Sequence, residues 1–164
     1  MNQAELQEIL TGFAADRLAL LERHEAGARV VSHYDFNNAY QYVINREETQ
    51  LSWLAKAIAD LGGAVPNDQV APQRPVSGKR GAAWRTIVEE DATEAQAFVK
   101  RWRPRVEALT HARHRNLLRV ILGETLEQQR LFEQALAGRT DLLGRRAEEL
   151  GPAIGEVLPA RWVE

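Results

Sequence analysis

A carboxylate interrupts the apolar stripe of residues 34–61, and this interruption limits the possible folds more than any other feature of the chain. At helical spacing the stripe comprises Phe36, Tyr40, Val43, Leu51, Leu54, Ile58 and Leu61. Glu47 takes the position between Val43 and Leu51 that should continue the stripe, and Gln50 follows on the same face. The pattern predicts a core-facing helix with a polar pair at its middle.

Three further segments show helical periodicity, and a long irregular segment divides the four into two pairs. Residues 3–25 carry a broad apolar face, a third helix is expected from about residue 87, and a fourth spans about 111–137. Glycines are expected to end the second helix at 62–63 and the fourth at Gly138, and the acidic residues 89–91, which include Asp91, favour the N-terminus of the third. Pro104 is expected to kink or divide the third helix. Residues 62–86 are rich in proline and glycine and predict a long surface crossover. Two helical hairpins joined by a crossover predict an all-α four-helix bundle.

Length and charge favour one soluble domain and give little indication of a partner. The 164 residues fit a single domain, with the bundle at about 3–138 and a C-terminal extension at 139–164 that holds a short helix near 141–150. The net charge of -2 gives no general attraction to nucleic acid or membrane, and the basic cluster within 100–119 is interpreted as solvated arginines. Without a basic apolar leader or a spanning segment, we expect a cytoplasmic protein with no nucleic-acid or membrane partner.

The second and fourth helices form a weak internal repeat. Sliding one onto the other by 78 residues superimposes their apolar stripes and aligns Tyr40 with Leu118, Val43 with Ile121, Gln50 with Gln128 and Leu54 with Phe132. Glu47 then meets Thr125, with Glu124 one position to the side. The middle of both helices is therefore polar, which predicts a hydrophilic layer at half height in the bundle.

The hairpin, crossover and hairpin plan resembles the rubrerythrin-like branch of the ferritin-like superfamily over about 3–138. The resemblance is carried by the segments NREETQLSWLAKAIADLGG and ILGETLEQQRLFEQALAG. It implies a carboxylate on the first and third helices and a Glu-x-x-His pair on the second and fourth, which together bind two iron or manganese ions. In this sequence Glu47 matches the second-helix glutamate, but Gln50 stands where histidine is expected.

The remaining metal ligands implied by the resemblance match less well. On the fourth helix Gln128 occupies the histidine place, and the glutamate is either replaced by Thr125 or supplied by Glu124, in which case Glu127 takes the histidine place. Asp16 and Glu94 are the nearest matches on the first and third helices. The candidate metal ligands are therefore Asp16, Glu47, Gln50, Glu94, Glu124, Glu127 and Gln128.

Two histidines offer a second pattern with metal-ligand spacing. His111 and His114 stand three residues apart near the start of the fourth helix. The segment around them is polar and arginine-rich, so we interpret them as a solvated pair.

Because glutamine is a weak ligand for a divalent transition metal, the sequence favours a non-catalytic or metal-deficient bundle with a structural or interaction role and no cofactor. The alternative is a di-iron or di-manganese carboxylate protein with an atypical ligand set, acting as an oxidoreductase or in iron binding. A small-molecule module is a third possibility and requires an open cavity on the polar layer. The resemblance also implies a homodimer.

Overall fold

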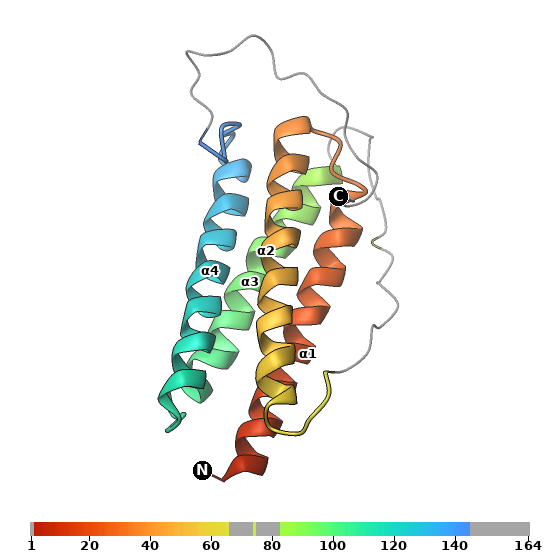
Figure 1. Ribbon diagram of the computed structural model, residues 1–164. Coiled ribbons are helices and arrows are strands. Elements are labelled where there is room, and N and C mark those ends of the chain that lie inside the picture. Colours follow the sequence, from red (N-terminus) through yellow and green to blue (C-terminus); the bar gives the residue numbers. More distant parts are fainter. Residues whose placement is uncertain (1, 66–73, 75–82, 145–164) are drawn as a thin grey trace.

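The structure is a computed structural model and describes residues 2–65, 74 and 83–144. Its helices are α1 (Gln3–Ala28), α2 (Tyr34–Ala59), α3 (Ala83–Glu107) and α4 (Ala112–Leu136). They pack as two hairpins, α1 with α2 and α3 with α4, joined by the crossover (Figure 1). The predicted all-α four-helix bundle with two hairpins is confirmed.

The first helix of the second hairpin runs parallel to the last helix of the first hairpin (Figure 1). Helix α2 runs antiparallel to α1, α3 runs in the same direction as α2, and α4 returns alongside α3 (Figure 1). Across the hairpins α1 packs on α3 and α2 packs on α4. Helices α1 and α4 therefore face each other across one diagonal of the bundle, and α2 and α3 across the other.

The helix ends follow from local backbone chemistry. Asn2 caps α1 by accepting a hydrogen bond from the Glu5 backbone, and the Glu5 carboxylate accepts one from the Asn2 backbone. Gly62 follows α2 with a φ of 80° and Gly138 follows α4 with a φ of 90°. A glycine costs little in this left-handed conformation, so both helices end at the predicted stops.

A buried asparagine closes the first hairpin. The Asn37 side chain is 2% exposed and donates to the carbonyl oxygens of Ala28 at 2.9 Å and Val31 at 3.3 Å. It thereby satisfies carbonyl groups left free at the end of α1. The second helix consequently leaves the turn at a fixed position relative to the first.

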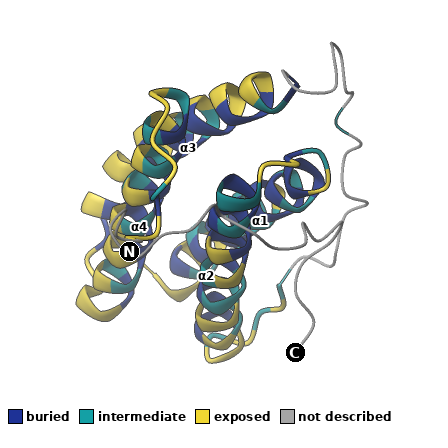
Figure 2. Ribbon diagram, turned by 90° about the horizontal axis from the view of Figure 1, so that it is seen from above, coloured by how far each residue is buried: buried dark blue, intermediate teal, exposed yellow. Residues whose placement is uncertain are grey.

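Two apolar clusters fill the bundle, one toward each end. Phe13, Leu54, Trp102 and Leu118 belong to the first, and Phe36, Val43, Ile87 and Phe132 to the second. Figure 2 shows the buried residues on the sides of the helices that face one another. Near the middle of the helices lie buried polar side chains that we call the polar layer: Arg17, His24, Glu47, Gln50, Thr125 and Gln128. The predicted hydrophilic layer is confirmed, and so is the burial of Glu47, Gln50, Thr125 and Gln128.

Pro104 does not divide the third helix, and the short helix expected after α4 lies mostly outside the described residues. Pro104 is an interior residue of the single helix Ala83–Glu107. Of the short helix expected at 141–150, residues 141–144 form a turn and the rest lies outside the described residues, as does most of the crossover at 62–86. No helix in the described part is both long enough and apolar enough to cross a bilayer.

Candidate functional site

Arg17 is the centre of the polar layer and is fully buried. Its Nη1 donates to Thr125 Oγ1 at 3.1 Å, and its Nη2 donates to Gln128 Oε1 at 3.1 Å. The same Nη2 lies 3.4 Å from Glu47 Oε1, whose side chain is also fully buried. Burial lowers the pKa of Arg17, while Glu47 and Glu124 oppose that shift, and a guanidinium stays protonated in proteins. The layer therefore contains a permanent positive charge that connects α1 with both α2 and α4.

His24 is the second buried side chain in contact with the Glu47 carboxylate. Its Nδ1 lies 2.9 Å from both carboxylate oxygens of Glu47, and the imidazole is 0% exposed. A carboxylate only accepts, so this contact assigns the hydrogen to Nδ1. The ring packs against Tyr40 and Phe132, and its Nε2 has no protein partner. Because His24 and Glu47 are closed to solvent, a solute can reach them only if the bundle opens.

An ion pair on the surface between α2 and α4 covers the layer. Arg46 donates twice to Glu124, at 3.1 and 2.6 Å, and Gln50 Nε2 donates to the same carboxylate at 2.5 Å. Gln50 is fully buried, whereas Arg46 and Glu124 are 31% and 28% exposed. The predicted repeat aligns Arg46 with Glu124, and the two residues meet in the structure.

A pocket of about 360 Å³ opens beside this ion pair. It is lined by Tyr42, Arg46, Glu124, Glu127, Gln128 and Leu131. The polar layer thus contributes Gln128 to a surface cavity. This is the kind of opening that the small-molecule alternative requires.

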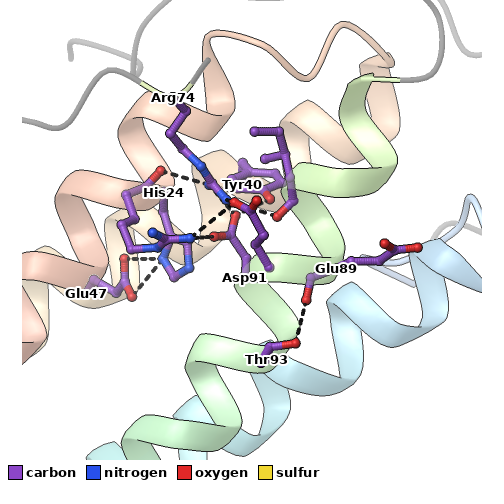
Figure 3. Close-up of polar contacts among 10 residues, drawn as sticks. His24, Tyr40, Glu47, Arg74, Glu89, Asp91 and Thr93 are labelled. Atoms are coloured by element: carbon purple, nitrogen blue, oxygen red, sulfur yellow. Dashed lines mark hydrogen bonds and ion pairs between the residues drawn. The ribbon is translucent and has the colours of Figure 1, made fainter. Parts of the chain in front are cut away.

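A second buried polar group lies nearer the end of the bundle that holds the first hairpin turn. Asp91 is 0% exposed on α3 and accepts a hydrogen bond from Tyr40 at 2.5 Å and another from Arg74 at 2.8 Å (Figure 3). Burial, followed by the neighbouring Asp91, raises the pKa of the Tyr40 hydroxyl well above its usual value. Arg74 belongs to the crossover, so this contact attaches the crossover to the helices.

The structure separates the candidate metal ligands. Asp16 faces away from the layer and accepts from Arg101 at 2.7 Å and Trp102 Nε1 at 2.8 Å. Glu127 is exposed and pairs with Arg130, and Glu94 lines a surface pocket. Glu47, Gln50 and Gln128 lie within the layer, with Glu124 at its edge. Asp16 therefore lies apart from the candidate ligands that the layer brings together.

The residues of the layer do not suit a pair of divalent metal ions. The Arg17 guanidinium lies beside Glu47 and Gln128, where its charge would repel a second cation. Both Glu47 oxygens are already within hydrogen-bonding distance of His24. In the part of the chain that the structure describes, no three His, Cys, Asp or Glu side chains are grouped so that they could hold a metal ion.

The residues that sequence reasoning missed have recognisable patterns. Arg17 and His24 continue the buried series Leu10, Phe13 and Leu20 at spacings of three and four residues. Asp91 lies four residues after buried Ile87 and four before Ala95. In each case the spacing along the helix places the residue on the core-facing side.

The histidine pair on α4 is only partly solvated. His111 and His114 have their Nδ1 atoms 2.8 Å apart, and His114 is 7% exposed. The expectation of a solvated pair is therefore wrong for His114. Burial, followed by His111 and Arg113, lowers the pKa of His114, while Asp60 opposes the shift.

Fold and site together define an all-α four-helix bundle whose interior carries a buried ionic layer. Comparisons with protein-family models, with curated proteins and with solved structures found no match to this chain.

Proposed function

We propose that the chain is a metal-independent bundle of the ferritin-like type, with a structural or interaction role rather than a catalytic one. The observation that carries this proposal is the burial of the Arg17 guanidinium between Glu47, Thr125 and Gln128. A dicarboxylate metal centre uses metal ions to neutralise inward carboxylates. In this chain Arg17 neutralises Glu47, and the charge balance of the layer is met by protein groups.

The order of the helices supports the ferritin-like part of the proposal. Two antiparallel hairpins are joined so that α2 runs parallel to α3 (Figure 1). A four-helix bundle with a single long connection between two hairpins is the ferritin-like plan, as distinct from bundles with short loops throughout or with two long connections. Ligands in ferritin-like bundles project inward from all four helices, and here the corresponding interior holds Arg17, Glu47, Thr125 and Gln128.

Metal content is the test of this function. The protein is produced in medium with added iron and manganese, purified without chelator, and analysed for both metals beside Glu47→Ala and the exposed control Glu127→Ala. We expect the same background level of metal in all three proteins. About two ions per chain in the wild type, lost only in Glu47→Ala, would identify a di-metal protein and overturn the proposal.

An interaction role needs a surface, and exposed apolar side chains on α2 and α4 support a homodimer. Tyr42 and Val120 are 50% and 52% exposed, and Trp53, which lies under the Arg46 guanidinium, is 37% exposed. Aromatic side chains are enriched in protein contacts. Sedimentation velocity should show a dimer in the wild type that dissociates in Val120→Arg. A monomer at all concentrations would contradict the homodimer.

The pocket between α2 and α4 favours a second candidate function, which is small-molecule binding. Its volume of about 360 Å³ suits a small organic ligand, and Tyr42 and Leu131 supply apolar walls around the polar Gln128. In an NMR screen of organic fragments, binding at this site should shift the side-chain amide of Gln128. A screen whose hits leave that amide unchanged would exclude the candidate.

A further inference from the structure

The side chain of Arg74, a residue of the crossover, is buried against the bundle. Arg74 Nη1 donates to Asp91 Oδ2 at 2.8 Å and to the Arg23 carbonyl at 3.2 Å. Its Nη2 donates to Glu90 Oε2 at 2.9 Å and to the Ile87 carbonyl at 3.1 Å. The side chain is only 5% exposed, and it enters between α1 and α3 (Figure 3). A single side chain thus has four acceptors arranged around it.

The space around this guanidinium, which we call the notch, is formed by Gly27, the carbonyls of Arg23 and Ile87, and the carboxylates of Glu90 and Asp91. A Cβ atom on Gly27 would lie 2.8 Å from Arg74 Nη1, so glycine provides room for the guanidinium. These acceptors surround the guanidinium of Arg74, which is planar and spreads its N–H donors over separate nitrogen atoms. An ammonium group has its donors on one atom and cannot reach such a set equally well.

The negative charge of the notch comes from Glu90 and Asp91, which both lie on α3. Asp91 is fully buried on α3, and of the neighbouring cations Arg23 lies farther from it, at 3.7 Å, than Arg74 does. Bonds to Asp91 and Glu90 raise the pKa of Arg74 even though burial lowers it. A carboxylate in this position needs a cationic partner, because burying a charge without one is strongly unfavourable.

An acidic pocket adjoins the notch. Its volume is about 420 Å³, and it is lined by Arg23, Thr86, Glu89, Glu90, Thr93 and Glu94. Three carboxylates against one guanidinium give this surface a negative balance, and Glu90 belongs to both the pocket and the notch. A positively charged segment is therefore attracted to the surface on which the notch opens.

We propose that the notch is a guanidinium-binding site that the chain fills with its own Arg74, and that an arginine side chain of a partner polypeptide binds there in exchange. The proposal rests on the interaction role given above and specifies the chemistry of the partner. Arg74 acts as an internal competitor, which keeps the affinity for an external arginine low while the crossover is attached.

Chemical rescue tests the site. Arg74→Ala should have a lower thermal unfolding midpoint than the wild type, and low-millimolar guanidinium chloride should raise that midpoint in a saturable manner. Sodium chloride, methylammonium chloride and urea at equal concentration should not. The matched control is Arg119→Ala, which removes an exposed arginine paired with Glu107 and should show no recovery. Absence of a guanidinium-specific recovery overturns the proposal.

Two further measurements, one of refolding and one of peptide binding, complete the test. If Arg74→Ala does not fold alone, the folded yield on refolding is measured with and without guanidinium, and Arg74→Lys is titrated in parallel. A labelled arginine-containing peptide should bind Arg74→Ala at least about tenfold more tightly than the wild type, because Arg74 no longer competes. Equal affinity for both proteins, or for a lysine-substituted peptide, overturns the proposal. Metal content tests the proposed function independently, so the two failures are distinguishable.

Discussion

Arg17 Nη2 and Glu47 Oε1 lie 3.4 Å apart at the middle of the bundle, and neither side chain is exposed. A buried ion pair is tolerated only when further hydrogen bonds satisfy both partners. Here Thr125 and Gln128 accept from Arg17, and His24 lies against Glu47. The pair joins α1 to α2, and the bonds of Arg17 reach α4 across the diagonal, so one charge network connects three of the four helices.

Two glycine substitutions should change stability in opposite directions. Gly27→Ala places a Cβ atom 2.8 Å from Arg74 Nη1 and 3.1 Å from Ile87 and Tyr40, so we expect a loss of about 1–3 kcal/mol from overpacking. Gly123→Ala meets no atom within 4 Å and should gain about 0.5–1 kcal/mol from helix propensity. Urea unfolding of both variants measures the difference. Equal effects would show that the notch has more room than the structure gives it.

Stability should depend on Tyr40 in alkaline solution. The folded state raises the pKa of Tyr40 above its usual value of 10.0, so the unfolded chain loses this proton first as the pH rises. The contribution is present below about pH 10 and is lost as the pH rises toward the folded-state pKa, at up to about 1.4 kcal/mol per pH unit.

Tyr40→Phe isolates this effect and removes the bond to Asp91. At neutral pH it should lose roughly 1–3 kcal/mol, because a hydrogen bond to a buried charged group is lost. Above pH 10 its free energy of unfolding should fall less steeply than that of the wild type. Parallel curves in urea unfolding from pH 8 to 11 would contradict the raised pKa.

His114 should make the bundle less stable in mild acid. The folded state lowers the pKa of His114 from its usual value of 6.5, so the unfolded chain binds this proton first as the pH falls. The contribution is present above about pH 6.5 and is lost as the pH falls through the folded-state pKa. His114→Gln should therefore lose less stability between pH 7 and pH 5 than the wild type. A larger loss in the variant would reverse the assigned direction.

The fold could be read from the sequence because its signals are local. Hydrophobic periodicity identified the four helices, and the stops at Gly62 and Gly138 were predicted from glycine, whose positive φ both residues adopt. The alignment of α2 with α4 also holds, since Gln50 and Gln128 are both buried, as are Val43 and Ile121. These features depend on spacing along one helix and require no knowledge of distant contacts.

The site was predictable only in part. Glu47 interrupts a clear apolar stripe and was identified, whereas on the first helix Asp16 was taken as the candidate ligand and Arg17 was not considered. The two are adjacent and differ by about 100° around the helix, and the prior against buried charge does not separate arginine from aspartate. The hydrogen-bond partners on other helices decide between them: Arg17 donates to Thr125 and Gln128, while Asp16 accepts from Arg101 and Trp102.

The contact of Arg74 had no local signal at all. Its segment has no periodicity, and its acceptors come from α1 and α3, as far as 51 residues away at the Arg23 carbonyl. Asp91 was expected to favour the N-terminus of the third helix, where acidic residues are common. Its burial could be recognised only together with Tyr40 and Arg74, which approach it from other parts of the fold.

Whether Arg17 is the cation that balances Glu47 can be measured with a double-mutant cycle in chelator-containing buffer. Arg17→Met and Glu47→Leu should each lose about 3–5 kcal/mol of unfolding free energy, because each leaves a buried charge unpaired. The double variant should lose less than the sum by about 1–3 kcal/mol.

The exposed pair Arg119 and Glu107 gives the matched control, and its coupling should be much weaker because solvent screens it. Strong coupling between Arg17 and Glu47 beside weak coupling in the control is the expected result. Additive losses for Arg17→Met and Glu47→Leu would show that Glu47 is balanced by another cation and that Arg17 is not its partner.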